Sequence, residues 1–365
     1  MGLSIGITGL PNVGKSTLFN ALTRAQNAQS ANYPFCTIEP NFASVPVPDP
    51  RLDALAKIAK PQKIINATVE FTDIAGLVKG AGRGEGLGNK FLANIRECDA
   101  VLHVVRCFAD ENVTHVEGSV DAVRDAQIIG GELLFADMET VEGKVQRLTK
   151  TARTDKDARK ELDAALLLQK HLEDGLPARA FADRDSEEMR GLLNDLRLLT
   201  DKKVIYVANT GENDLQGNAA SRALAEFAAK EGAAHVVICA KIEEDMAGIS
   251  EAERAEFLSS YGITESGLDL IVKTGYETLG LMSFLTAGPK EVRAWTIRKG
   301  WTAPKAAGVI HTDFERGFIR AQVISFADFI AHGGEQQCKA SGLARMEGKE
   351  YVMRDGDVTE FLFNV

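Results

Sequence analysis

The sequence predicts an α/β protein that is built on a parallel sheet, carries a helical insertion and has a smaller mixed α+β region at its C-terminal end. Three observations lead to this prediction. Short runs rich in β-branched residues, at 3–8, 68–72, 100–105, 204–207 and 235–238, alternate with helical patterns. The stretch 132–199 lacks strand patterns. Strand-like runs return with a different spacing from residue 291 onward.

Length and composition limit the function classes. The chain has 365 residues, enough for two or three domains. It carries 42 Lys and Arg against 52 Asp and Glu, a formal charge of −10, which excludes a globally basic nucleic-acid-binding surface but not a local basic patch. No apolar run approaches the roughly 18 residues of a membrane span. The first six residues lack the basic segment of a secretory signal, and the five cysteines show no paired metal spacing, so we expect a cytoplasmic protein without a membrane partner.

The first strand, 3–8, leads into a phosphate-binding loop. Gly9, four further residues and then Gly14-Lys15-Ser16 fit the pattern of such loops, in which glycines let backbone N–H groups turn toward phosphate oxygens at a helix N-terminus. Lys15 would bridge the outer phosphates, and the Ser16 hydroxyl would coordinate Mg²⁺. The predicted nucleotide-binding residues of the loop are Asn12, Val13, Gly14, Lys15, Ser16 and Thr17.

The second strand, 68–72, supplies a carboxylate. Asp73 follows it directly, where it would hold Mg²⁺ through water, and the N–H of Gly76 would meet the terminal phosphate. The turn-prone segment 32–40 contains Thr37, which would offer a second hydroxyl to the metal. The predicted Mg²⁺ ligands are therefore Ser16, Thr37 and Asp73.

The fourth and fifth strands carry a modified base motif. Asn209, Thr210 and Glu212 stand where GTPases have Asn-Lys-x-Asp. The usual Asp accepts two hydrogen bonds from guanine, whereas the Glu212 side chain is one methylene longer, and Thr210 lacks the lysine stem that covers the purine. These differences disfavour guanine specificity. Cys239 and Ala240, after the strand 235–238, occupy the place of the last base-contacting loop.

The insertion 132–199 predicts an antiparallel helical hairpin, because two apolar helical faces are separated by the polar run 154–157. Cations recur every three residues along it. A solvated coiled-coil surface and an RNA-facing stripe both explain this spacing. The cations are Lys144, Arg147, Lys150, Arg153, Lys156 and Arg159.

After an amphipathic helix near 268–276, strands are predicted at 292–297, 321–324, 351–353 and 358–363. Cations lie close to aromatic residues in this region. Such pairs suit phosphate contact with base stacking, while the alternative is an aromatic core under a solvated surface. The residues concerned are Arg293, Arg298, Lys299, Lys305, Arg316 and Arg320 beside Trp295, Trp301, Phe314 and Phe318.

Together, the phosphate loop, Asp73 with Gly76, and the modified base motif resemble the Obg-related branch of the translation-factor P-loop NTPases. The match is closest to the YchF family, the Obg-like ATPases, and covers essentially the whole chain. It includes 32–41, the glycine-rich 76–89, and 303–326, which resembles a TGS (β-grasp) domain. The resemblance implies a G-domain-like unit over 1–278, with the insertion inside it, and a TGS domain over 279–365.

The resemblance further implies a Mg²⁺-dependent ATPase that prefers ATP over GTP and binds the ribosome, through ribosomal RNA and large-subunit protein, according to its nucleotide state. An Obg-type GTPase and a nucleotide-gated RNA- or ribosome-binding module with incidental hydrolysis are the alternatives. Leu77 stands where many GTPases carry the water-orienting Gln, and His115 matches a histidine of the family that would replace it. The expected catalytic residues are Lys15, Gly76 and His115, with K⁺ a further expected cofactor, beside Asn12.

Overall fold

The computed structural model describes residues 3–29, 41–74, 86–110, 113–246 and 249–364. The chain forms two compact units. The first unit comprises Met1–Leu22, Glu39–Ala43 and Glu70–Leu268, and the second comprises Thr23–Ile38, Ser44–Val69 and Asp269–Val365.

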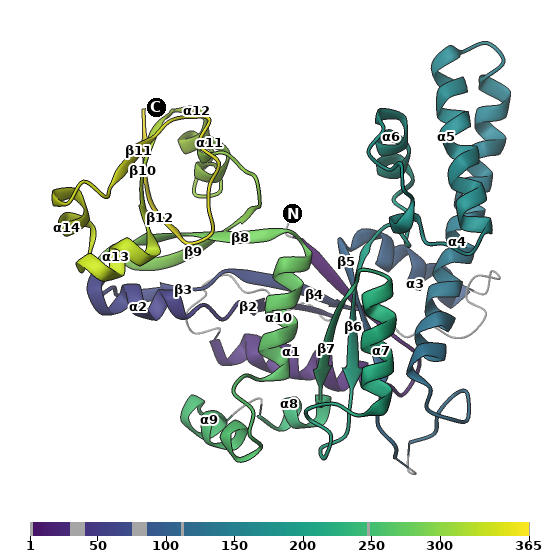
Figure 1. The fold of residues 1–365 in the computed structure, drawn as a ribbon, viewed down its shortest axis with the longest axis horizontal. Coiled ribbons are helices and arrows are strands. Elements are labelled where there is room, and N and C mark those ends of the chain that lie inside the picture. Colours follow the sequence, from purple (N-terminus) through teal and green to yellow (C-terminus); the bar gives the residue numbers. More distant parts are fainter. Residues whose placement is uncertain (1–2, 30–40, 75–85, 111–112, 247–248, 365) are drawn as a thin grey trace. The chain divides into compact units, whose positions relative to one another are not determined.

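A six-stranded sheet organises the nucleotide-binding half of the fold (Figure 1). Its strand order is β2-β4-β1-β5-β6-β7, and the pairs β4–β1, β1–β5, β5–β6 and β6–β7 are all parallel. The predicted parallel α/β sheet is therefore confirmed. The strands are β1 (Ser4–Thr8), β2 (Phe42–Pro46), β4 (Thr68–Asp73), β5 (Ala100–Arg106), β6 (Lys203–Asn209) and β7 (Ala234–Ile238).

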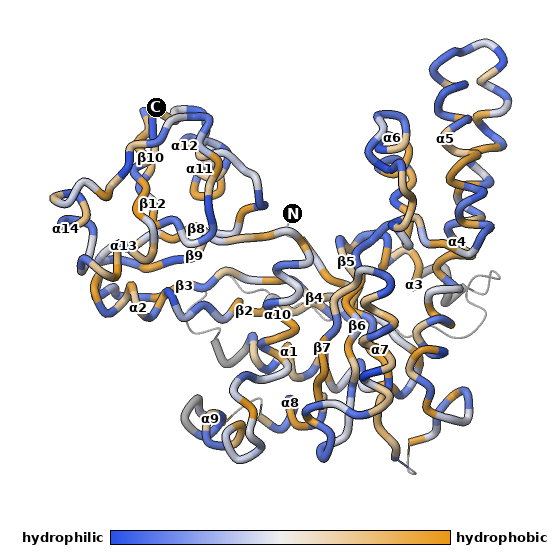
Figure 2. The backbone as a smooth tube through the Cα atoms, viewed as in Figure 1, coloured by the Kyte–Doolittle hydropathy of each residue, from blue (hydrophilic) through white to orange (hydrophobic). Residues whose placement is uncertain are grey.

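The centre of this sheet is apolar because both of its faces are covered. Every residue of β5 is buried, and so is every residue of β6 after Lys203. Figure 2 shows these strands mostly in the hydrophobic colour. Continuous apolar runs of this kind are typical of parallel strands between helices. The helices that follow the strands are α1 (Lys15–Gln29), α3 (Gly86–Glu97), α7 (Ala219–Lys230), α8 (Ala240–Met246), α9 (Glu251–Ser260) and α10 (Gly267–Thr278).

The helical arm consists of α4 (Ala122–Thr151), α5 (Lys156–Glu173), the short η3 (Ala178–Ala180) and α6 (Glu187–Leu196). Helices α4 and α5 run side by side and confirm the predicted hairpin (Figure 1). The polar run predicted as its turn contains Asp155, which caps α5 by accepting hydrogen bonds from the N–H groups of Asp157 and Ala158. The expected start at residue 132 is wrong, because one unbroken helix runs from Ala122. Within the described residues, no helix is long and apolar enough to cross a membrane.

The second unit contains the other sheet, with the strand order β11-β10-β12-β8-β9-β3. Its strands are β3 (Lys63–Ile65), β8 (Leu281–Ala287), β9 (Glu291–Arg298), β10 (Phe318–Ser325), β11 (Arg345–Glu347) and β12 (Asp357–Phe363). Its helices are α2 (Pro50–Ala59), α11 (Ala303–Ala307), α12 (Thr312–Arg316), α13 (Phe326–His332) and α14 (Glu335–Ala340). Strand β3, far from the rest in sequence, pairs in parallel with β9.

One expectation for this unit needs correction, and for the aromatic residues the structure favours one of the two alternatives. The strand predicted at 351–353 is absent, and Val352 makes only an isolated bridge with Thr302. The aromatic residues belong to the core: Phe318 is 5% exposed, and Trp295 and Trp301 pack against the same apolar cluster. Arg293 lies over the Trp295 ring at 3.7 Å. The chain's own side chains therefore occupy the rings that a base would need for stacking.

Candidate functional site

The phosphate loop connects the end of β1 to the start of α1. Gly9 and Gly14 have φ angles of 151° and 95°, a region that favours glycine, and Asn12 has a φ of 61°. A Cβ atom on Gly9 would overlap Val104 O, and one on Gly14 would overlap the Asn209 side chain. Both glycines are therefore required, and the loop backbone lies at the N-terminus of α1, where N–H groups favour anions.

Lys15 and Asp73 form the charged part of the site. Lys15 is largely buried, and its Nζ donates a hydrogen bond to Leu10 O at 2.7 Å. Burial lowers the pKa of Lys15, while the charge of Asp73 acts in the opposite direction. Burial likewise raises the pKa of Asp73, at the end of β4, and Lys15 opposes that shift. Each group thus stabilises the charged form of the other.

The donor set suits a hard cation. Ser16 is the second residue of α1 and is exposed, and Asp73 contributes a carboxylate, so both predicted ligands in the described region offer oxygen, which Mg²⁺ prefers. Thr37, Gly76 and Leu77 lie outside the described residues. Within the described ranges, no group of three or more His, Cys, Asp and Glu side chains could hold a metal ion.

Asn209 joins two loops of the site. It is buried at the end of β6, its Nδ2 donates to Val13 O at 2.9 Å, and its Oδ1 accepts from Ala240 N at 2.9 Å. The amide therefore fixes the phosphate loop relative to the loop after β7. Thr210 is also buried, and its hydroxyl donates to Ile238 O at 3.0 Å.

Glu212, which follows β6, and Lys241, in α8, form an ion pair. Glu212 Oε1 lies 2.5 Å from Lys241 Nζ, and both side chains are exposed. Cys239 is buried, and burial raises the pKa of its thiol, so the thiol is an inert part of the loop. The sequence places Lys241 in the last base-contacting loop but does not predict its pairing with Glu212, because no local spacing indicates that the two side chains meet.

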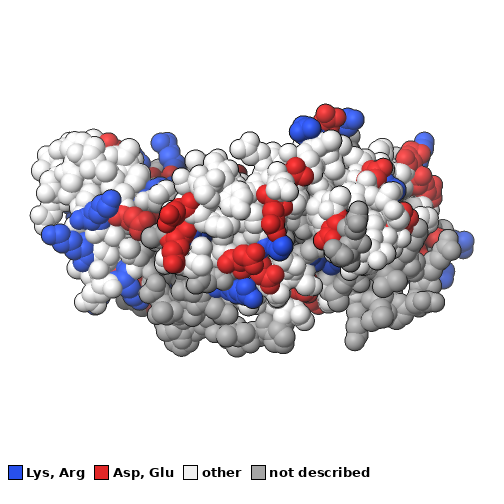
Figure 3. Space-filling model, turned by 90° about the horizontal axis from the view of Figure 1, so that it is seen from below, with Lys and Arg blue, Asp and Glu red and all other residues white. Residues whose placement is uncertain are grey.

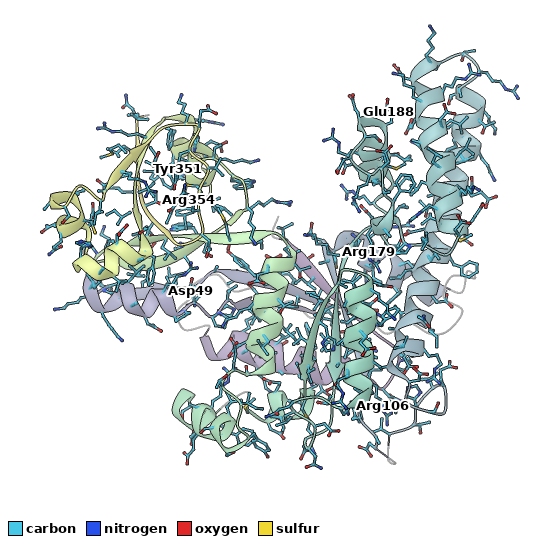
Figure 4. The ribbon with its side chains drawn as sticks, viewed as in Figure 1. Asp49, Arg106, Arg179, Glu188, Tyr351 and Arg354 are labelled. Atoms are coloured by element: carbon cyan, nitrogen blue, oxygen red, sulfur yellow. The ribbon has the colours of Figure 1, made fainter. Side chains whose placement is uncertain are left out.

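The loop after β5 is held by Arg106, a residue that the sequence prediction missed. Its side chain is 2% exposed, and its guanidinium donates to Phe108 O at 3.1 Å, Val113 O at 2.9 Å and Asp110 O at 3.2 Å (Figure 4). Next to this anchored segment, Thr114 O accepts a hydrogen bond of 3.2 Å from Asn12 Nδ2, which links the loop to the phosphate loop.

His115 follows in the same loop. Its Nδ1 accepts a hydrogen bond from Glu117 N at 3.0 Å, and its Nε2 lies 2.7 Å from Asp125 Oδ2. This pattern assigns the proton to Nε2. Asp125 is 1% exposed and also accepts hydrogen bonds from Arg124. Both ring nitrogens are thus engaged, so the imidazole must release one partner before it can contact a water molecule.

Comparisons with known proteins agree along the whole chain. The MMR_HSR1 family model, described as a 50S ribosome-binding GTPase, matches residues 4–132. The YchF-GTPase_C model, described as a protein of unknown function (DUF933), matches residues 281–364.

Full-length relatives are named for one family. The "Ribosome-binding ATPase YchF" of Bacillus subtilis (strain 168) is 52% identical over 369 residues and that of Mycoplasma genitalium is 46% identical over 370, each match covering all of both chains. The solved structure of the Schizosaccharomyces pombe YchF GTPase has a TM-score of 0.89 and 40% identity, covering 99% of this chain and 98% of that one. At this identity and coverage, the chain belongs to the YchF family.

Proposed function

We propose that this protein is a Mg²⁺-dependent ATPase that acts as a nucleotide-dependent ribosome-binding switch in the cytoplasm. Relatives that match the whole chain are named ribosome-binding ATPases. The structural observation that carries the proposal is the base motif: Asn209 is fixed by two hydrogen bonds, and the carboxylate three positions later is paired with Lys241.

The ion pair gives a physical reason for preferring ATP. Guanine needs a carboxylate that accepts from both N1–H and the exocyclic amine. Glu212 is one methylene longer than the usual Asp, and Lys241 competes for its oxygens at 2.5 Å. Adenine has no N1–H to donate, so the pairing of Glu212 with Lys241 does not weaken its binding. We therefore infer that GTP binds more weakly than ATP.

The phosphates would be bound by the N–H groups of the loop and by Lys15, which would exchange its bond to Leu10 O for phosphate oxygens. Ser16 and Asp73 are the described residues that would hold Mg²⁺. When bound, the ion neutralises charge on the phosphates. The proposal also includes K⁺ beside Asn12, a second hydroxyl from Thr37, and the division into a nucleotide-binding unit over 1–278 and a TGS domain over 279–365.

His115 is proposed to orient the attacking water, together with the N–H of Gly76. Replacing it with Ala should lower the turnover number at least tenfold while leaving ATP affinity within about twofold, because the ring contacts Asp125 and Glu117 rather than the phosphate loop. Single-turnover hydrolysis and fluorescent-nucleotide titration measure the two quantities. Equal losses in both would instead indicate that the loop has collapsed.

The second candidate is a GTPase, since the Schizosaccharomyces pombe relative is titled one and the first family model is described as one. Competition of unlabelled ATP and GTP for one fluorescent nucleotide separates the candidates. ATP should compete more tightly, and tighter GTP binding would overturn the ATP assignment.

Lys15→Ala should abolish binding of both nucleotides, because this largely buried ammonium is the loop's own side-chain cation. Lys57→Ala, on the exposed surface of α2, is the matched control and should change nothing. Unchanged affinity in Lys15→Ala would contradict the site assignment.

A further inference from the structure

A chain of hydrogen bonds links the start of α4 to the loop that carries His115. The His115 side chain is 6% exposed, and its Nε2 lies 2.7 Å from Oδ2 of Asp125, which is in the first turn of α4 and is 1% exposed. The other oxygen of Asp125, Oδ1, accepts hydrogen bonds from Arg124 Nε at 3.1 Å and Arg124 Nη2 at 2.8 Å. Each oxygen of this carboxylate therefore has its own partner.

The two bonds of the imidazole give its nitrogens different roles. Nδ1 of His115 accepts from the N–H of Glu117 at 3.0 Å, so it carries the lone pair of the ring, and Nε2 donates to Asp125. A carboxylate that accepts from one ring nitrogen holds a neutral imidazole in that tautomer and makes the opposite nitrogen a better acceptor. In this tautomer Nδ1 is the acceptor of the ring.

The bond at Nδ1 is the one that a water molecule can replace. The residues on either side of Glu117, Val116 and Gly118, are exposed, so solvent can bond to the Glu117 N–H once the ring releases it. Asp125 is buried, and a buried carboxylate that loses a donor is strongly destabilised. Asp125 would therefore keep its bond to Nε2 while Nδ1 of His115 exchanges Glu117 for water.

This part of the loop is bonded to the phosphate loop. The residue before His115 is Thr114, whose carbonyl oxygen accepts a hydrogen bond of 3.2 Å from Asn12 Nδ2. The backbone next to the imidazole is thus tied to the segment that would bind the phosphates. A ring nitrogen with a free lone pair would serve there as an acceptor for water.

We propose that Asp125 is a positioning residue for ATP hydrolysis. It holds the proton of His115 on Nε2 and so leaves Nδ1 to accept a hydrogen bond from the attacking water. Arg124 contributes by fixing which oxygen of Asp125 faces the ring. This inference rests on the proposed function, in which His115 orients that water.

Asp125→Asn tests the tautomer, because Arg124 decides how the new amide is oriented. A guanidinium only donates hydrogen bonds, so the amide oxygen must take the place of Oδ1 and the NH₂ group must face Nε2 of His115. Nε2 would then have to accept, and the proton would move to Nδ1. Nitrogen-15 NMR of the histidine rings, with the His115 signals assigned by His115→Ala, distinguishes the protonated nitrogen from the other in the nucleotide-free protein.

The same variant should slow hydrolysis. In single-turnover experiments, Asp125→Asn should lower the rate constant at least about tenfold and leave ATP affinity within about twofold, because only the acceptor for water is lost. Asp121→Asn is the matched control. It makes the same chemical change at the exposed N-cap of α4, where Asn caps as well as Asp, and should keep the parental tautomer, rate and affinity.

A second background tests the part of Arg124. In Arg124→Met, the amide of Asp125→Asn is free to turn its oxygen toward Nε2, so the proton of His115 should return to Nε2. The loss of rate caused by Asp125→Asn should then be at least about threefold smaller than in the parental background. Circular dichroism and thermal melting establish that all variants are folded.

Three results would overturn the positioning role. They are a proton that stays on Nε2 in Asp125→Asn, a parental rate once the proton has moved to Nδ1, and an equal loss of rate in both backgrounds. A parental rate in His115→Ala would refute the role of His115 itself, and the positioning role with it. The tautomer is read without nucleotide, so this failure of the proposed function is distinguishable from a failure of Asp125 to hold the proton.

Discussion

The amide of Asn209 makes two hydrogen bonds in opposite roles, donating to Val13 O and accepting from Ala240 N. Its position also explains Gly14, because a side chain there would overlap the amide nitrogen. One buried residue thus couples the loop that would bind phosphates to the loops that would bind the base. A substitution of Asn209 should therefore weaken the binding of every nucleotide, whatever its base.

Asn209→Ala should therefore weaken ATP and GTP binding by the same factor, at least tenfold. It should also lower the free energy of unfolding by about 1–3 kcal/mol, because Ala240 N–H and Val13 O would be left without a partner in a buried environment. Fluorescent-nucleotide titration and urea unfolding measure the two effects. Asn20→Ala, an exposed asparagine paired with Glu244, is the control. A selective loss of ATP binding alone would contradict the coupling role.

His103 makes a prediction about pH. Burial holds its pKa near 3 in the folded protein, whereas the unfolded chain binds the proton near the ordinary 6.5. Between these values the unfolded state carries more protons, so stability is lost as the pH falls, by up to about 1.4 kcal/mol per pH unit. His103→Gln should remove this part of the slope between pH 6 and 4, measured by urea unfolding. Parallel pH profiles for the two proteins would show that the ring is protonated when folded.

At the scale of elements, the arm is stabilised by a row of apolar residues between α4, α5 and α6. Leu168 is fully buried in this row, while its neighbour Leu167 is 59% exposed. Leu168→Ala should destabilise the arm by about 2–5 kcal/mol, and Leu167→Ala by less than about 0.5 kcal/mol. Hydrogen exchange of α5 reports the difference. Equal effects would mean that the two helices do not pack as described.

The arm was predictable from its apolar periodicity, but its start was not. Helix α4 is buried against the sheet side at Ala126 and Ile129 and continues into the hairpin at Val141 without a break in the pattern. No feature of the local sequence indicates the residue at which α4 stops packing against the sheet side and starts packing within the hairpin. Strand β3 has three residues, and its pairing partner β9 lies more than 200 positions away in the sequence. Three residues are too few for an alternating pattern that would predict a strand.

The residues of the site also differ in whether the nearby sequence can predict their role. The phosphate loop follows from one contiguous motif, because its geometry depends on glycines and a helix N-terminus that are adjacent in sequence. Arg106 and Lys241 act through neighbours that only the fold brings together. Arg106 ends a strand in which every residue is buried and whose other polar residue is His103. A cation in such a strand is the signal that could have indicated an anchored loop.

At the scale of the whole molecule, basic and acidic side chains are interspersed on the face shown in Figure 3, in keeping with a net charge of −10. The predicted basic stripe of the arm is not uniform. Lys144 is neutralised by Glu161 at 2.7 Å and Asp195 at 2.9 Å. The other five cations of the stripe are exposed, and four of these lie nearest the turn between α4 and α5. The five are Arg147, Lys150, Arg153, Lys156 and Arg159, and the four nearest the turn are Lys150, Arg153, Lys156 and Arg159.

This cluster at the turn is the surface on which the proposed ribosome contact can be tested. Each phosphate that a cation neutralises releases counterions, so binding must weaken steeply as KCl rises. Replacing the four cations with Ala should lower ribosome affinity and reduce the salt slope by about one for each phosphate that is no longer neutralised. Co-sedimentation with ribosomes, with a non-hydrolysable ATP analogue and with ADP, measures both quantities. Lys230→Ala, exposed on α7, is the control and should leave the slope unchanged. If the variant with all four substitutions keeps the ribosome affinity and the salt slope of the parent, the turn between α4 and α5 does not contact RNA. Equal ribosome binding with the ATP analogue and with ADP would contradict the proposed nucleotide-dependent switch.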